Sequence, residues 1–197
     1  GGIMFREQCL IGEDENVGDV HDRLMEMGSK LVVQTVEAII ENHVDTRVQK
    51  SFIQGAEVLK PAPKITKELC HIDFRCKTKH VYNLIRGLSP YPGAYTELVK
   101  DDKIQQLKIY SAERIEGEAF TAMLKEAGME AANPGDILSD GRSFLAIATS
   151  DGAVSVKELQ VSGKKRMAVK DFLLGFRDAQ SWKTTEGTSS KITGHHA

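Results

Sequence analysis

The sequence predicts a mainly-β fold in which a small barrel with flanking helices follows one strand and one long helix. First, five strand-like runs separated by turn signals crowd into about 70 residues of the C-terminal half. Second, the N-terminal part holds one strand-like run and one long amphipathic run, which cannot enclose a core by themselves. We therefore divide the chain into a remnant of an α/β domain over 1–43, a linker over 44–66, a barrel domain over 67–178 and a tail over 179–197.

The N-terminal segment predicts a strand over 3–11 and a helix that ends near Asn42. Asn16 or Asp19 can cap this helix, because a short polar side chain there accepts hydrogen bonds from the first backbone amides. The apolar residues of the helix recur at helical spacing and form a wide face. They are Val20, Leu24, Met27, Leu31, Val32, Val36, Ala38, Ile39 and Ile40. Because such a face needs a partner, we expect it to pack on a larger domain that precedes residue 1.

The linker and a second helix come next. Residues 44–66 show no sustained period, and two prolines stiffen their middle. The helix is expected to start near 73–77, where Asp73 can cap it. It must stop at Ser89-Pro-Tyr-Pro-Gly-Ala-Tyr95, because two prolines fix the backbone and remove two amide donors. Gly93 then allows a sharp redirection into the first barrel strand.

The barrel is predicted from short runs with strand-like composition. An Asp-Gly pair stands between successive runs at 140–141 and again at 151–152, and this pair is a strong hairpin signal. A short surface helix is expected over 118–130 and a closing helix over 169–176. From Gln180 onward, Thr, Ser, Gly and Lys dominate, and we expect disorder. The strand-like runs are 94–99, 104–115, 135–138, 144–149 and 153–161.

Composition and charge restrict the class of protein. No run approaches the roughly 18 apolar residues of a membrane-spanning helix, and no signal-peptide pattern is visible. Three cysteines are too few for a disulfide scaffold, which favours a reducing compartment, and we expect the cytoplasm. Residues 1–60 carry 6 basic and 11 acidic side chains, whereas residues 61–178 carry 18 and 16. The second region is therefore slightly basic and suits a polyanionic partner.

Metal binding and catalysis find little support in the sequence. Two cysteines and two histidines lie close together, but their spacing matches no zinc motif, so we expect no metal site. They are Cys70, His71, Cys76 and His80. Glu68 and Asp73 suggest a carboxylate pair, but helix capping explains Asp73 more simply. No nucleophile elbow, P-loop or dinucleotide fingerprint is present, so we predict no catalytic residue.

A basic loop is the strongest candidate for function. Lys164, Lys165 and Arg166 follow a predicted strand, and Lys170 lies nearby. Such a loop on a small barrel suits the phosphate oxygens of a nucleic acid, although a solvated surface turn has the same composition. Residues that would extend it are Lys64, Lys67, Arg86 and Lys108, with Tyr91 and Tyr95 as candidate stacking partners for bases. At least one of these two tyrosines is expected in the core.

Five motifs follow one another along the second region of the chain. They are Ala62-Pro-Lys-Ile-Thr-Lys-Glu68, Ile85-Arg-Gly-Leu-Ser-Pro-Tyr-Pro-Gly-Ala-Tyr95, Leu107-Lys-Ile-Tyr-Ser-Ala112, Pro134-Gly-Asp-Ile-Leu138 and Gly163-Lys-Lys-Arg-Met167. Their combination resembles the methionyl-tRNA formyltransferase family. The resemblance implies an OB-like barrel preceded by the last strand and helix of a Rossmann-like catalytic domain. It also implies formyl transfer from 10-formyltetrahydrofolate to the amino group of initiator methionyl-tRNA in translation initiation, by an enzyme that is monomeric in this family.

The catalytic residues of that family, an Asn, a His and an Asp, match no position of this sequence. The chain alone is therefore expected to be inactive, to bind no folate and to contribute tRNA binding. Two alternatives stay open, which are a fragment of a formyltransferase for a nucleotide-linked amino sugar and a non-enzymatic nucleic-acid-binding barrel. The basic loop favours tRNA over a nucleotide sugar, and the apolar N-terminal helix argues against a stand-alone barrel.

Overall fold

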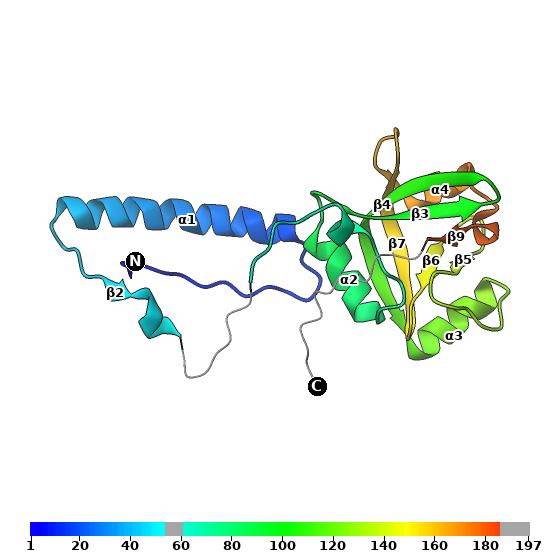
Figure 1. The fold of residues 1–197 in the computed structure, drawn as a ribbon, viewed down its shortest axis with the longest axis horizontal. Helices are drawn as coiled ribbons and strands as arrows, with labels where there is room; N and C mark the ends of the chain where they lie inside the picture. Colours follow the sequence, from blue (N-terminus) through cyan, green and yellow to red (C-terminus); the bar gives the residue numbers. More distant parts are fainter. Residues whose placement is uncertain (54–60, 186–197) are drawn as a thin grey trace. The chain divides into compact units, whose positions relative to one another are not determined.

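A computed structural model describes residues 1–53 and 61–185, and the chain divides into two compact units, Gly1–Lys64 and Ile65–Ala197 (Figure 1). The mainly-β architecture with flanking helices, predicted from the sequence, is confirmed. Within the described ranges, no helix is both long enough and apolar enough to cross a membrane.

The first unit holds one long helix and a minimal sheet. β1 (Gly2–Ile3) pairs antiparallel with β2 (Arg47–Val48), and a 3₁₀ turn, η1 (Gln49–Phe52), follows. The predicted strand over 3–11 is wrong beyond its first residue, because β2 offers a partner only to β1 and a strand needs a hydrogen-bonded neighbour. β2 was not predicted, since two residues leave no readable period.

Helix α1 (Val17–Ile40) is confirmed and begins at a capping box. The Asn16 side-chain oxygen accepts hydrogen bonds from the amides of Gly18 and Asp19 at 2.7 and 3.1 Å. The Asp19 carboxylate in turn accepts one from the Asn16 amide at 2.9 Å. Both candidate capping residues therefore act together, which satisfies several amides of the first turn. No residue within α1 is buried, and the residues of its apolar face are exposed or half-buried.

The second unit is built on one antiparallel sheet that nearly closes into a barrel (Figure 1). Its strands lie in the order β5-β6-β7-β4-β3-β9, and β8 pairs with β7. An isolated bridge between Asp136 and Lys183 joins the two ends of this order, as barrel closure requires. The strands are β3 (Ala94–Lys100), β4 (Lys103–Glu116), β5 (Ile137–Ser139), β6 (Leu145–Ala148), β7 (Gly152–Val161), β8 (Met167–Ala168) and β9 (Lys183–Thr184).

The five predicted strands and the three predicted helices of this unit are confirmed within a few residues. Strands β8 and β9 were missed, because two-residue strands are fixed by their tertiary partners and leave no pattern. The core lies inside the sheet and beneath α2 and α4, with Leu98, Leu107 and Leu159 fully buried. The helices and 3₁₀ turns are η2 (Glu68–Cys70), α2 (Thr78–Gly87), α3 (Gly117–Glu126), α4 (Val169–Leu174) and η3 (Ala179–Ser181).

Helix α2 is anchored by Asp151, which is distant from the helix in the sequence. Asp151, in the β6–β7 turn, accepts hydrogen bonds from the Thr78 amide at 2.7 Å and the Thr78 hydroxyl at 2.9 Å. That hydroxyl also meets the Thr149 hydroxyl at 2.7 Å. The backbone hydrogen bond from Thr78 lowers the pKa of the Asp151 carboxyl. The expectation that Asp73 caps α2 is wrong, because its carboxylate binds Arg75 at 2.8 Å.

The tail predicted over 179–197 folds onto the barrel at its start. Trp182 is buried, and its ring lies 5.0 Å from that of Phe176. Strand β9 follows and pairs with β3. The disorder expected from Gln180 is therefore wrong through the end of β9, because one tryptophan supplies enough apolar surface to hold a polar segment. Residues 186–197 lie outside the described part of the chain.

Candidate nucleic-acid interface

Strands β3, β4 and β7 present one polar face away from the core. Tyr95 of β3 lies opposite Lys108 of β4, and Lys108 lies opposite Gln160 of β7. Leu107 and Ile109, the neighbours of Lys108 along β4, have no exposed surface. Successive residues of a strand point to opposite faces, so Tyr95, Lys108 and Gln160 share the outer face.

Tyr110 also lies on this outer face, two positions after Lys108 in β4. The pairing of β4 with β7 is locally irregular here, because Ile109 pairs with Leu159 and Ser111 with Glu158, and the register is restored by the next pair, Ala112 with Val156. The Tyr110 hydroxyl donates a hydrogen bond to Gln160 Oε1 at 2.7 Å, which fixes the ring beside the row of polar residues.

Side-chain contacts tie this row to the basic loop. Gln160 Nε2 donates a hydrogen bond to the Lys164 carbonyl at 2.8 Å. The Arg166 guanidinium lies over the Tyr110 ring, 4.6 Å from its centroid, in cation–π geometry. These contacts join two strands and a loop into one surface. We call the set of Lys108, Tyr110, Gln160 and Arg166, together with Lys164 and Lys165 of the same loop, the barrel face.

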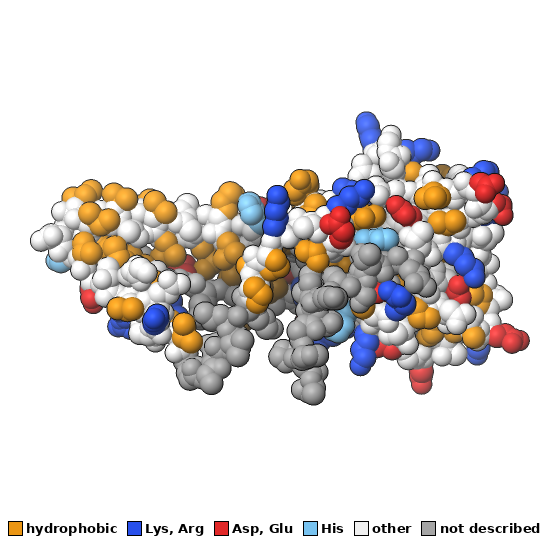
Figure 2. Space-filling view, in the orientation of Figure 1, with side chains coloured by type: hydrophobic (Ala, Val, Ile, Leu, Met, Phe, Trp, Pro, Cys, Tyr) orange, Lys and Arg blue, Asp and Glu red, His pale blue; other side chains and the backbone are white. Residues whose placement is uncertain are grey.

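The loop over 162–166 connects β7 to β8 and projects from the barrel (Figure 1). Gly163 adopts a φ of +76°, a conformation that favours glycine, and the Lys164 amide donates to the Val161 carbonyl at 2.9 Å. The tight turn that results holds the following side chains outward. Lys and Arg side chains gather at the tip of this projection (Figure 2).

The three cations of the loop differ in their surroundings. Lys164 and Lys165 are exposed, and among the described residues no carboxylate pairs with either of them. Arg166 forms an ion pair with Glu158 and is held against Tyr110 as well. The loop therefore offers two mobile ammonium groups, whose lysine stems rotate freely, and one guanidinium that is positioned in advance.

A second aromatic cluster borders the barrel face at Tyr95. The His71 ring stacks on the Tyr95 ring at a centroid distance of 4.9 Å and an interplanar angle of 5°. The Lys67 ammonium lies 5.8 Å from the same ring centroid. Tyr95 is buried although it lies on the outer face of the sheet, because the segment that carries Lys67 and His71 covers its ring. Burial raises the pKa of its hydroxyl, and one of the two corner tyrosines is confirmed as part of the buried hydrophobic cluster. Lys67 and Lys108, which lie on different elements, thus both come close to Tyr95 of β3.

The other predicted cations belong to other elements of the chain. Arg86 lies on α2, where its Nε donates to Asn83 Oδ1 at 2.8 Å. Lys170 is exposed in the first turn of α4, and Lys64 is the last residue of the first unit. The surface that the structure assembles therefore rests on Lys67, Lys108 and the loop.

Two residues of the barrel face were not predicted from the sequence. Tyr110 stands two positions after Lys108 in a strand-like run, so alternation gave a signal that the two share a face. Gln160 has no comparable signal, because its place depends on the register between β4 and β7, which is fixed by tertiary pairing.

The cysteines near α2 are packed in the interior of their unit. Cys70 is buried, its Sγ donates to the Thr66 carbonyl at 3.3 Å, and burial raises the pKa of its thiol. Burial also raises the pKa of the Cys76 thiol. Within the residues that the structure describes, no three His, Cys, Asp or Glu side chains are grouped as ligands for a metal ion. Neither thiol has the lowered pKa of a reactive cysteine.

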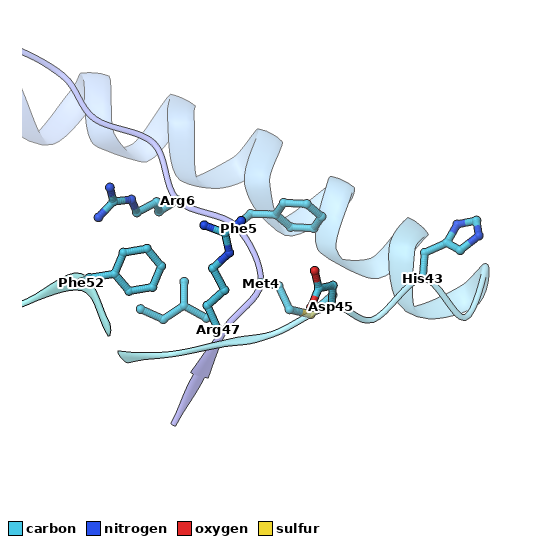
Figure 3. A pocket seen from close by; sticks show the side chains of 8 residues that line it. Met4, Phe5, Arg6, His43, Asp45, Arg47 and Phe52 are labelled. Atoms are coloured by element: carbon cyan, nitrogen blue, oxygen red, sulfur yellow. The ribbon is translucent and has the colours of Figure 1, made fainter. Parts of the chain in front are cut away.

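A hollow of about 330 Å³ opens in the first unit, between its first residues and the segment after α1. The Arg6 guanidinium lies over the Phe52 ring at 4.4 Å, and Arg47 stands beside this pair (Figure 3). His43 lies at the far end and points away from the two arginines (Figure 3). The side chains that line the hollow therefore do not bring an acid and a base together at one position.

The barrel face has the chemistry of a phosphate-binding surface. Ammonium and guanidinium groups donate charge-assisted hydrogen bonds to phosphate oxygens. Contacts of this kind fix the position of a nucleic acid without reading its sequence.

Comparisons with known proteins show the family to which the second unit is similar. Residues 64–177 match the family described as formyl transferase, C-terminal domain. Methionyl-tRNA formyltransferase of Parabacteroides distasonis is 40% identical over 178 residues, which are 90% of this chain and 52% of that protein. The enzyme of the same name from Phocaeicola vulgatus is 42% identical over 184 residues, which are 93% of this chain and 53% of that protein. The chain thus spans about half the length of these relatives.

A solved structure shares the fold. HypX from Aquifex aeolicus, solved as a variant, superposes with a TM-score of 0.59 over 90% of this chain and 29% of HypX. The sequences are 17% identical, so this likeness concerns the fold alone.

Proposed function

The chain belongs to the formyl transferase family through its C-terminal domain, and on this premise we propose that it supplies the tRNA-binding part of a methionyl-tRNA formyltransferase. The whole protein would transfer a formyl group from 10-formyltetrahydrofolate to the amino group of initiator methionyl-tRNA. This reaction would prepare the tRNA for translation initiation in the cytoplasm. The names of the two relatives support the substrate, and the barrel face supports the role of this part.

The single observation that carries the proposal is that side-chain contacts join the basic loop to the strands of the barrel. Arg166 is fixed by Glu158 and Tyr110, while Lys164 and Lys165 extend beyond it. A tRNA backbone presents phosphates along a curved path, so a projecting basic loop beside a rigid cationic face can contact several of them. Because the contacts are to phosphates, this surface would position tRNA and would not select among tRNA species.

The 197 residues would bind and would not catalyse. The family resemblance places none of the catalytic Asn, His and Asp in this sequence, so we expect no folate to bind. Incubation with 10-formyltetrahydrofolate and charged initiator tRNA should give no formyl transfer above a control without protein.

The salt dependence of tRNA binding tests the proposal. Each phosphate contact contributes about 0.9 to the slope of log affinity against log salt on a duplex. Replacing Lys164, Lys165 and Arg166 by Ala should therefore flatten this slope by about two to three units. Fluorescence anisotropy with labelled tRNA at several salt concentrations gives the slope, and thermal unfolding checks that the variant is folded.

A charge-matched variant supplies the control. Lys103, Lys125 and Arg142 are exposed in the second unit and lie outside the barrel face. Their replacement by Ala removes the same charge and should leave the slope within about one unit of the parent. If both triple variants flatten the slope equally, binding follows net charge alone and the barrel face is not the interface.

A further inference from the structure

The proline corner before β3 is buried at its base and exposed at its tip. Ser89 is 2% exposed, whereas Tyr91 is 83% exposed. Gly93 adopts a φ of +84°, and its amide donates to the Leu88 carbonyl at 2.8 Å. With Pro90 and Pro92 on either side, the backbone of Tyr91 has little freedom. The corner therefore presents one aromatic ring from a rigid support.

Close packing joins this corner to the barrel face. Lys108 Nζ donates a hydrogen bond to the Pro92 carbonyl at 2.8 Å. A Cβ atom at Gly93 would lie 3.2 Å from Tyr110 Cε1 and 3.3 Å from Lys108 Cδ, so the corner backbone rests directly on these two side chains. Tyr91 directly precedes Pro92 in the chain, so its backbone adjoins the contact with Lys108. The exposed side chain therefore starts at the edge of the barrel face.

An aromatic ring beside cations is the arrangement with which proteins bind unpaired nucleotides. The cations hold the phosphates, and the ring stacks on a base without selecting its identity. Exposed apolar side chains that are scattered singly need no such explanation. Tyr91 differs from them because its backbone is already fixed, so stacking would order little more than one side chain.

We propose that Tyr91 stacks on an unpaired nucleobase of the RNA whose phosphates the barrel face binds. The inference rests on the proposed function and adds a ligand class to it, namely an RNA segment with an unpaired base in place of a fully paired helix. The positive charges of Lys108 and of the loop favour a nucleic acid over an apolar protein surface as the partner of the Tyr91 ring.

Binding of short RNA by the 197-residue chain tests the inference. The probes are a single-stranded RNA of about ten nucleotides and the same backbone with abasic sites, which keeps the phosphates and removes the bases. Tyr91→Ala should weaken binding of the first probe about fivefold or more and leave binding of the abasic probe unchanged. Tyr91→Phe should bind both probes like the parent, because it keeps the ring. The salt slope should be the same in all three proteins.

A matched control and the outcomes separate this inference from the proposed function. Ile104 is 69% exposed on β4, and Ile104→Ala should bind both probes like the parent. Equal binding of the first probe by the parent and by Tyr91→Ala would overturn the stacking inference alone, provided that the triple Ala variant of the loop still flattens the salt slope. A parent chain that binds neither RNA nor tRNA would overturn both proposals.

Discussion

Helix α1 and the barrel sheet use the same types of apolar residue in opposite surroundings. Leu24 and Val32 of α1 are 51% and 63% exposed, and no residue within that helix is buried. Leu107, Ile109 and Leu159 of the sheet have no exposed surface. A closing sheet supplies the second side of its own core, whereas a single helix needs a separate partner. The comparison teaches that a periodic pattern shows which face is apolar and leaves open what covers it.

The two regions also differ in how they fix charge. On the barrel face, Arg166 is held by an aromatic ring and a carboxylate. On α1, Lys30 pairs with Glu26 one turn away, and both side chains are more than two-thirds exposed. An exposed helical pair of this kind contributes little to stability. Arg166 is therefore more constrained than the Lys30–Glu26 pair.

Hydrogen exchange should show the largest contrast. Strands β4 and β7 have neighbours on both edges and carry the core, so their amides should exchange about a thousandfold more slowly than those of α1. Exchange followed by mass spectrometry at neutral pH measures both regions in one sample. Equal protection would break the comparison, unless dilution abolishes the protection of α1 and thereby shows self-association.

Paired truncations should sharpen the contrast in free energy. Leu107→Ala should lower the free energy of unfolding of the barrel by about 2–5 kcal/mol, because it leaves a cavity in a closed core. Leu24→Ala should change it by less than about 0.5 kcal/mol, since its side chain is already half exposed. Trp182 is the single tryptophan and lies in the barrel, so its fluorescence in urea reports this transition. A large effect of Leu24→Ala would contradict the separation of the two regions.

The anchor of α2 should give a smaller effect that depends on pH. Asp151→Ala should lower the free energy of unfolding by about 1–3 kcal/mol, because the Thr78 amide and hydroxyl lose their acceptor. Asp151→Asn keeps one acceptor oxygen and should lose less. Asp102→Ala, in the exposed β3–β4 turn, is the matched control and should have no measurable effect.

The sign of the pH dependence follows from the lowered pKa of Asp151. Its contribution to stability is present above the ordinary pKa of 3.8 and is lost as the pH falls through the lower pKa of the folded state. Asp151→Asn should therefore lose less stability than the parent between pH 4 and pH 2, a window set by that ordinary value of about 4. Identical acid profiles of the two proteins would show that this carboxylate is not the anchor.

Local signals explain the parts of the fold that the sequence predicts. The Asp-Gly pairs at 140–141 and 151–152 determine hairpins within a few residues, and Asn16 caps α1 through amides two and three positions away. Strand β9 depends on contacts with β3, which are distant in the sequence. The cap of α2 likewise comes from Asp151, 73 residues away from Thr78, and no local pattern reveals it.

The candidate site divides in the same way. Lys164, Lys165 and Arg166 are visible as a run of charge. The partners that fix Arg166, which are Tyr110 and Glu158, are brought together by the pairing of β4 with β7, and this pairing leaves no local mark in the sequence. The positive charge of the loop could therefore be predicted from the sequence, whereas the contacts that hold Arg166 in place could not.

Lysine footprinting on tRNA tests the central claim most directly, because it compares the barrel face with the rest of the unmodified chain. The chain is acetylated briefly with and without saturating tRNA, and mass spectrometry gives the extent of acetylation at each lysine. Our account predicts that acetylation of Lys164 and Lys165 falls several-fold in the presence of tRNA, while that of Lys125 on α3 and Lys30 on α1 stays unchanged. Unchanged acetylation of Lys164 and Lys165, or an equal fall at Lys125, would contradict the assignment of the barrel face as the tRNA-binding surface.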